Sequence, residues 1–461
     1  MEHASSICRE KKDAAHLMRL AISAIQRERH SFVEDPTSLL RTEDDNERSV
    51  RGEPSEDEES VFDAIEGDRG KHASRSAYII RQIKRPEEVE FLRGVYGDAF
   101  ILISAYGSRK ERSEALQKKI KASARTPIND VKAQFLAEKL IESDMNEDRD
   151  NFGQHMRDSF HLADAIIEGL DRTQITIDLE RFISLLFGAN DVGPTREEYG
   201  MNGAYQASLR STDLSRQIGA IVYSPTGEVL TQGCNEVPRA FGGTYWDGES
   251  PDFRDVKLGV DSNDILKMDV LRDLFLRLKR DGILSDSVSS LGSPNKIADI
   301  LVGRVDADEE NKAFQGKLKN AKILDLTEYG RVVHAEMSAI CDAARNGTSL
   351  RMATLFTTTF PCHNCTKHII GAGVRKVIYL EPYPKSKAKE LHNNEITIEE
   401  VEGKVSFIPF KGVAPRRYKG LFAKGKRKRN GEAVRWYHGS PAPMVNTLTL
   451  HYLTVEDLVK A

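Results

Sequence analysis

Two short segments of the chain carry residues whose types and spacing suit a catalytic metal site. His334-Ala335-Glu336 forms an H-x-E motif, and Cys362 and Cys365 form a P-C-x-x-C motif. Histidine nitrogen and cysteine sulfur are preferred zinc ligands, and three protein ligands leave the fourth position of a tetrahedral zinc to water. The two motifs therefore predict a catalytic zinc (Zn2+) site with His334, Cys362 and Cys365 as metal ligands.

Helix geometry gives a reason for this spacing. Pro361 suits the first turn of a helix, so Cys362 and Cys365 should lie at i and i+3 on one face of that turn. The positive end of the helix dipole favours the thiolate form of cysteine, which is the form that binds zinc. We expect His334 to open the preceding helix and to face the same metal.

Glu336 is the candidate catalytic residue. It lies two positions after a ligand, close enough to take a proton from a zinc-activated water and pass it to a substrate. H-x-E together with P-C-x-x-C is the signature of zinc-dependent nucleobase deaminases, in which water attacks C4 of cytosine and the amine leaves as ammonia. A redox C-x-x-C would leave the H-x-E motif unexplained, and a closed structural zinc site would need a fourth ligand such as His363 or His368.

Composition and charge limit the classes of protein to consider. The chain has 461 residues, enough for two or three domains, and five cysteines, an odd number that fits a reducing compartment. No run of 18 apolar residues is present, so we expect a cytoplasmic protein with no membrane segment. Residues 34–69 carry fourteen acidic and four basic side chains, and residues 401–461 carry twelve basic and four acidic ones. The basic tail would suit nucleic acid or nucleotide phosphates, or serve as a solvated face.

The whole chain from about Tyr78 onward resembles the cytidine/deoxycytidylate deaminase superfamily, and more closely the two-domain bacterial anti-phage dCTP deaminases. The stretches that carry the resemblance are AYIIRQIKRPEEVEFLRGVYG, FGQHMRDSFHLADAII, LRSTDLSRQIGAIV, GCNEVPRAFGGTYW, HAEMSAI, FPCHNCTKHIIGAG and EPYPKS. The resemblance implies an α/β fold: a mixed five-stranded sheet between helices, with zinc between two helix N-termini. Such proteins also begin with a P-loop kinase-like domain, but no G-x-x-x-x-G-K-[ST] motif precedes the first helix here.

The resulting domain plan has four parts. Residues 1–33 form an N-terminal helix, residues 34–75 an acidic disordered linker, residues 76–190 a truncated P-loop kinase-like α/β domain, and residues 191–461 the deaminase domain. The first α/β domain should contain strands at 76–84 and 99–107. The deaminase domain has a helical insertion at about 240–328 and the basic tail at about 411–461. Because residues 1–75 show little core-forming pattern, we expect their removal to leave folding intact.

The resemblance also implies five substrate-binding residues. Asn235 matches the residue that holds the sugar, while Arg210 and Ser211 match a segment that meets the phosphate. Tyr383 and Lys385 follow the strand after the zinc helix and would line the same pocket. The alternatives are a turn asparagine, a helix cap and an ordinary surface lysine.

The predicted activity is hydrolytic deamination of free deoxycytidine nucleotides, dCTP to dUTP with dCMP as a further substrate. The resemblance implies that this depletes dCTP in antiviral defence, that the enzyme is a homo-oligomer, and that a regulatory RNA or protein controls it. The alternatives are a dCMP deaminase of nucleotide metabolism, a polynucleotide cytidine or adenosine deaminase supported by the basic run KGKRKRN, and a degenerate deaminase fold that only binds nucleotide.

Overall fold

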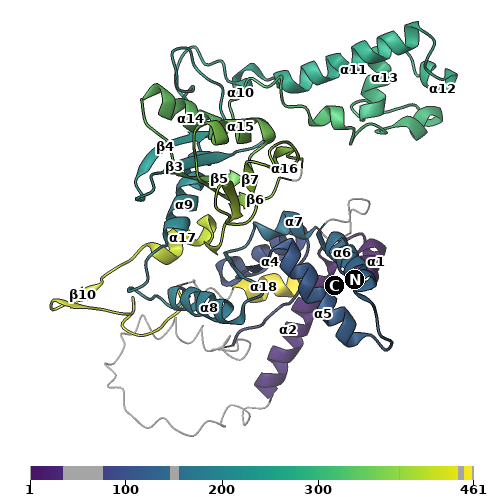
Figure 1. The fold of residues 1–461 in the computed structure, drawn as a ribbon. Coiled ribbons are helices and arrows are strands. Elements are labelled where there is room, and N and C mark those ends of the chain that lie inside the picture. Colours follow the sequence, from purple (N-terminus) through teal and green to yellow (C-terminus); the bar gives the residue numbers. More distant parts are fainter. Residues whose placement is uncertain (1, 35–75, 146–154, 384, 445–450, 459–461) are drawn as a thin grey trace, which may run out of the picture. The chain divides into compact units, whose positions relative to one another are not determined.

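The computed structural model describes residues 2–34, 76–145, 155–383, 385–444 and 451–458 (Figure 1). The chain forms two compact units: Met1–Pro194 together with Lys411–Ala461, and Thr195–Phe410. The expected acidic linker, apart from its first residue, lies outside the described residues. None of the described helices is long and apolar enough to cross a membrane.

The second unit is built on a mixed sheet of six strands in the order β4-β3-β5-β6-β8-β7. Strand β3 runs antiparallel to both of its neighbours, whereas β5, β6, β8 and β7 pair in parallel. The sheet adds one short edge strand, β7, to the five that the sequence predicted. The strands are β3 Gly219–Tyr223, β4 Val229–Cys234, β5 Thr354–Thr359, β6 Lys376–Glu381, β7 Ile396–Thr397 and β8 Val405–Pro409.

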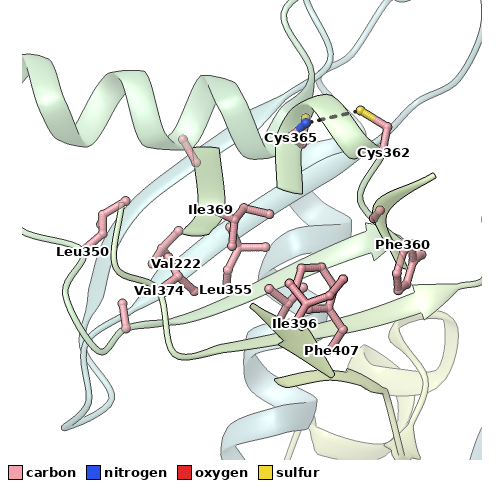
Figure 2. Packing of buried hydrophobic residues seen from close by; sticks show 14 of the residues in the cluster. Val222, Leu350, Leu355, Phe360, Cys362, Cys365, Ile369, Val374, Ile396 and Phe407 are labelled. Atoms are coloured by element: carbon pink, nitrogen blue, oxygen red, sulfur yellow. Dashed lines mark hydrogen bonds between the residues drawn. The ribbon is translucent and has the colours of Figure 1, made fainter. Parts of the chain in front are cut away.

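Helices of this unit pack on the sheet through one apolar core. Val222, Leu355 and Ile369 are almost fully buried in it, beside Phe360 and Phe407 (Figure 2). All residues of β3 are buried, which explains why its sequence GAIVY is continuously apolar. The helices are α9 Arg196–Ser208, α14 Ala335–Arg345, α15 His363–Gly371 and α16 Ala388–Leu391.

The predicted insertion is helical and has a small core of its own. Met268, Leu271 and Phe275 lie at i, i+3 and i+7 on one face of α11, where they pack with Ile297 and Ile300 of α13. Its elements are α10 Asp255–Leu258, α11 Ser262–Arg280, α12 Asp286–Ser289, α13 Pro294–Val302, η3 Glu309–Phe314 and η4 Lys322–Asp325.

The first unit holds a three-stranded sheet in the order β1-β2-β9, with β1 parallel to β2 and β9 antiparallel to it. Its elements are α1 Glu2–Lys11, α2 His16–Glu34, α4 Pro86–Tyr96, η2 Gly97–Ala99, β1 Ile103–Tyr106, α5 Arg109–Ser123, α6 Asp130–Met145, α7 Met156–Phe160, β2 Ala165–Glu168, α8 Arg172–Leu186, β9 Gly412–Val413, α17 Pro415–Phe422, β10 Lys428–Arg429, β11 Glu432–Ala433 and α18 His451–Leu458.

Three features of this unit differ from the sequence-based expectations. The strand expected at 76–84 has no regular structure, since no neighbouring strand pairs with it. The N-terminal helix is two helices, which separate near Lys12 with its φ of 52°. Residues 2–34 also contribute to the core, which the sequence did not predict, because Met18 and Ile22 are buried against Leu92 and Val95.

The basic tail belongs to the first unit, whereas the sequence placed it in the deaminase domain. Val413 pairs with Ala165 of β2, and Arg417 donates from Nε to Asp164 Oδ1 over 3.1 Å. Asp164 is fully buried, so this ion pair and the strand pairing fasten residues 411–422 to a segment about 250 positions earlier. The second unit therefore ends at Phe410.

Candidate metal centre

Three side chains bring their ligand atoms together in the second unit. His334 Nδ1 lies 3.3 Å from Cys362 Sγ and 3.5 Å from Cys365 Sγ, and both cysteines are buried. A tetrahedral zinc with ordinary bond lengths separates a nitrogen and a sulfur ligand by about 3.6 Å. Within the described residues, His334, Cys362 and Cys365 are the group of His, Cys, Asp or Glu able to hold a metal ion. The donor types and spacings thus fit zinc.

Two helix N-termini converge on this cluster. His334 is the N-cap of α14, and Cys362 is the N-cap of α15, where its sulfur accepts a hydrogen bond from Cys365 N over 3.4 Å (Figure 2). The backbone N–H groups and dipoles of both helices favour negative charge at this point. The two cysteines share this turn as their i, i+3 spacing predicted, whereas Pro361, which was expected in the first turn, lies just before the N-cap.

Gly233 in β4 allows α14 to lie close to the sheet. A Cβ atom at Gly233 would meet Ala335 O at 2.4 Å and Ala339 N at 2.6 Å, so only glycine fits. Asn235, two residues further, accepts a hydrogen bond from Ala335 N at its side-chain oxygen over 2.9 Å. Both residues fix the start of α14, and with it His334.

The surroundings of the cluster shift the pKa values of the two cysteine thiols in opposite directions. The hydrogen bond from Cys365 and the nearby His334 lower the pKa of the Cys362 thiol to about 4 against the opposing effect of burial. The hydrogen bond with Cys362 raises the pKa of His334 to about 9. The pKa of Cys365 is raised by its hydrogen bond to Cys362 and by burial. A second thiolate here therefore needs a nearby cation, a condition that a bound zinc ion satisfies.

Glu336 lies beside the cluster and is 4% exposed. Burial, followed by the charge of Cys362, raises the pKa of the Glu336 carboxyl above its ordinary value. The Thr357 hydroxyl donates to Glu336 Oε1 over 3.2 Å. A carboxyl group with a raised pKa is suited to take up and release a proton near neutral pH.

A cavity of about 160 Å³ opens onto these residues. Its lining includes His334, Glu336 and Cys362, together with residues from both ends of the helical insertion. The complete lining is Asp213, Ser215, Arg216, Ile218, Asn235, Asp255, Asp261, Asn263, Thr327, Gly330, Arg331, Val332, His334, Glu336, Thr359, Phe360, Cys362 and Tyr383. A substrate that reaches Glu336 would therefore also contact the insertion.

Two of the five expected substrate residues line this cavity. Asn235 is buried, and its side-chain nitrogen donates to Asp213 Oδ2 and to Arg216 O, so its amide is held on both sides. Tyr383 is half-buried at the rim, and burial raises the pKa of its phenol. The resemblance therefore selected two residues that the fold brings to the zinc cluster.

The other three expected substrate residues are not part of the cavity lining. Arg210 stacks on Trp246, with its guanidinium carbon 3.5 Å from the ring centroid, and donates to Thr244 Oγ1 over 2.6 Å. Ser211 is buried, and its hydroxyl accepts from the backbone of Asp213. Lys385 forms an ion pair of 2.6 Å with Asp325.

The structure adds two cations that sequence reasoning did not select. Arg216 lines the cavity with its guanidinium hydrogen-bonded to Glu381 over 2.6 Å, and it lies in the same LRSTDLSRQIG stretch as Arg210. Arg331 also lines the cavity and donates to Asp255 Oδ1 over 2.7 Å. Its position three residues before the predicted ligand His334 was the signal in the sequence that could have identified it.

Neither histidine considered for a closed structural site joins the three ligands. His363 Nε2 lies 3.7 Å from Glu328 Oε1, and His368 Nδ1 lies 2.8 Å from Asn364 O. Among the described residues, the ligand group contains neither of them. The geometry leaves one coordination position to a non-protein ligand.

Comparison with known proteins relates this region to one family. Residues 194–381 match the model of the cytidine and deoxycytidylate deaminase zinc-binding region. The deoxycytidylate deaminase of Enterobacteria phage T2 is 47% identical over 55 residues, which are 12% of this chain and 29% of that protein. ComE operon protein 2 of Bacillus subtilis is 39% identical over 74 residues, 16% of this chain and 39% of that protein. The chain thus spans less than half the length of these relatives.

Solved structures were also compared with this chain. The dCMP deaminase from the cyanophage S-TIM5 in apo form aligns with 48% of this chain and 100% of its own, at 19% identity and a TM-score of 0.24.

Proposed function

We propose that the chain hydrolyses the amino group of cytosine nucleotides at the cluster of His334, Cys362 and Cys365, and the match of residues 194–381 to the cytidine and deoxycytidylate deaminase zinc-binding region supports this proposal. The observation that carries the proposal is the position of Glu336, a buried carboxyl group with a raised pKa beside three zinc-ligand side chains. In the overall reaction, cytosine and water give uracil and ammonia.

The residues have distinct roles in this reaction. His334, Cys362 and Cys365 would hold zinc, which supplies the Lewis acidity that makes water nucleophilic near neutral pH. Glu336 would accept one proton of the attacking water and deliver it to the ring nitrogen next to C4, and would then transfer the second proton, from the hydroxyl now on C4, to the departing amine. Thr357 holds the Glu336 carboxylate in place.

Charged groups around the cavity support a phosphorylated substrate. Arg216 and Arg331 both line the cavity, and each is hydrogen-bonded to a carboxylate, Glu381 and Asp255 respectively. Arginine binds phosphate oxygens in a bidentate manner. We propose dCTP as the main substrate, as the resemblance to anti-phage dCTP deaminases implies, with depletion of dCTP as the antiviral effect. The names of the relatives make dCMP the second candidate.

The remaining functional expectations are part of the same proposal. A cytoplasmic homo-oligomer under the control of a regulatory RNA or protein follows from the family resemblance.

Product analysis tests the proposal. Purified protein with its zinc content measured is incubated with dCTP, dCMP, cytidine and a cytosine-containing oligonucleotide, and uracil products are separated by chromatography. We expect uracil formation from dCTP, with dCMP as second substrate and far slower turnover of cytidine. Turnover of the oligonucleotide alone would assign the chain to polynucleotide deaminases, and the absence of all uracil products with zinc bound would refute deamination.

A further inference from the structure

The segment KRKRNGEAVR in the first unit forms a short β-hairpin. Lys428 of β10 pairs with Ala433 of β11, and Arg429 pairs with Glu432 in an antiparallel register (Figure 1, label β10). Asn430 and Gly431 connect the strands with φ angles of 52° and 91°. Two consecutive positive φ angles at Asn-Gly are typical of a type I′ turn, whose twist matches that of the strands. The hairpin is therefore a defined structural element.

The base of the hairpin is fastened to the end of α8. Asn190 N donates to Arg435 O over 2.7 Å, and the Asn190 side chain donates to Val434 O over 3.1 Å. Trp436 forms a β-bridge with Ala189, and Val434 N donates to Arg427 O over 2.8 Å, which extends the ladder by one step. These hydrogen bonds hold the base of the hairpin in place, and the tip of the hairpin extends from this base.

Four consecutive cationic side chains occupy the first arm of this hairpin. Lys426, Arg427, Lys428 and Arg429 are all exposed. Within the described parts of the chain, no carboxylate forms an ion pair with any of the four, although most other exposed arginines of the protein have such a partner. Glu432 is the one acidic residue between Lys424 and Arg435. Clustered like charges repel each other, so folding alone gives no reason for this concentration.

The shape of the hairpin excludes a small anion as its natural ligand. Successive side chains of a strand point to opposite faces, so Lys428 and Arg429 diverge, and residues on the same face lie about 7 Å apart. A single phosphate needs donors that converge, as they do at a helix N-terminus or in a backbone nest. A row of diverging cations on a convex ribbon instead suits an anion with regularly repeated charges.

We propose that this hairpin, residues 426–435, binds the phosphodiester backbone of a nucleic acid without reading its sequence. Arginine and lysine on both faces can contact successive phosphates, and each contact releases a counterion. Trp436 and Tyr437 follow directly at the base, with Arg435 placed 5.1 Å from the Trp436 ring centroid, and offer aromatic faces for base stacking. This proposal does not depend on the deaminase activity.

Fluorescence anisotropy with the full chain provides the test. The probes are labelled 20-nucleotide RNA and DNA single strands and a DNA duplex, titrated at several salt concentrations. Four contacts to a single strand predict a slope of log K against log salt of about −3, and four to a duplex a slope of about −4. Comparison of the three probes shows which form of nucleic acid is preferred.

The decisive variant replaces Lys426, Arg427, Lys428 and Arg429 with glutamine. A matched control replaces four exposed cations on and after α5, Lys110, Lys118, Lys119 and Arg125, so that both variants lose the same charge within the same unit. We expect the hairpin variant to lose at least about 30-fold in affinity and nearly all salt dependence, and the control to lose less than about threefold. Equal losses of affinity in both variants would show that binding depends only on net charge, and this result would overturn the proposal.

A second variant separates the shape of the hairpin from its charge. Gly431→Val keeps every cation but opposes the φ of 91° at the turn. We expect it to bind nucleic acid several-fold more weakly while circular dichroism stays unchanged. Binding to anionic lipid vesicles with no binding to any of the three nucleic acids would also contradict the proposal. Glu336→Gln should bind nucleic acid like the parent protein, so a failure of the deaminase proposal leaves this test intact.

Discussion

Two of the buried carboxylates, one in each unit, have opposite kinds of hydrogen-bond partner. Asp164, in the first unit, is fully buried and accepts hydrogen bonds from Arg417 and from Leu102 N, with Arg93 and Arg416 also nearby. Glu336, in the second unit, is 4% exposed and accepts a hydrogen bond from the neutral hydroxyl of Thr357.

The difference in partners explains a difference in role. A buried carboxylate that is paired with arginines contributes to a fixed structure. A buried carboxyl group with a neutral donor and a neighbouring thiolate has a raised pKa, and it can therefore change its protonation state during a reaction. The comparison predicts that substitutions of the two residues will have separable effects.

Loss of a zinc ligand should have the largest effect. In Cys362→Ser and Cys365→Ser the thiolate that completes the donor set is gone, so we expect loss of both zinc and activity, measured by metal analysis and uracil formation. Cys341→Ser, at an exposed cysteine on α14 outside the cluster, is the matched control and should retain both. Zinc loss in the control would show that the ligand assignment is wrong.

Glu336→Gln should have the second-largest effect. The amide keeps the size of the side chain but cannot transfer the proton, so kcat should fall by roughly 10²- to 10⁴-fold. Zinc content should remain that of the parent protein, because Glu336 lies outside the ligand group. Loss of zinc in this variant would give Glu336 a structural role and remove the contrast with Asp164.

Asp164→Ala should leave the zinc site intact and destabilise the first unit. Removal of one partner from a buried ion pair costs about 3 to 5 kcal/mol. Asp98→Ala is the matched control, because Asp98 also binds Arg417 but is 71% exposed in its side chain, and its loss should cost at most about 1 kcal/mol.

The two tryptophans allow this measurement to be made on one unit. Trp436 lies in the first unit and Trp246 in the second, so urea unfolding in a Trp246→Phe background follows the first unit by fluorescence. Equal destabilisation by the two aspartate substitutions would contradict the structural role of Asp164.

The zinc cluster could be predicted from the sequence because local geometry determines it. A proline followed by two cysteines at i and i+3 brings both thiols to one helix turn, and His334 begins the preceding helix in the chain. Asn235 and Tyr383 were correctly expected near it. The sequence did not predict the contacts of Arg210, because its partners Thr244 and Trp246 come from a segment with no periodic pattern.

Long-range pairing accounts for what the sequence could not predict. The tail joins the first unit through two residues of β9 and through ion pairs of Arg416 and Arg417 with Asp164, and these contacts leave no periodic signal in the sequence. The interaction of Met18 and Ile22 with Leu92 is of the same kind, since it depends on a contact across the undescribed segment 35–75. The assignment of residues 76–190 to a P-loop kinase-like domain stays a prediction.

Thr357→Val should have the smallest effect, and it tests how Glu336 is positioned. The Thr357 hydroxyl is fully buried, lies 3.2 Å from Glu336 Oε1 and 3.1 Å from Thr359 O, and valine removes it without a large change in volume. Loss of a single hydrogen bond to a charged group is worth about 1.5 to 3 kcal/mol, so kcat should fall by about 10- to 100-fold with zinc retained. Without this donor the carboxylate is harder to ionise, and the acidic limb of the pH–rate profile should move to higher pH. Thr357→Ser keeps the hydroxyl and should restore both the rate and the profile. A valine variant with reduced rate but an unchanged pH profile, and no rescue by serine, would show that Thr357 acts through packing alone.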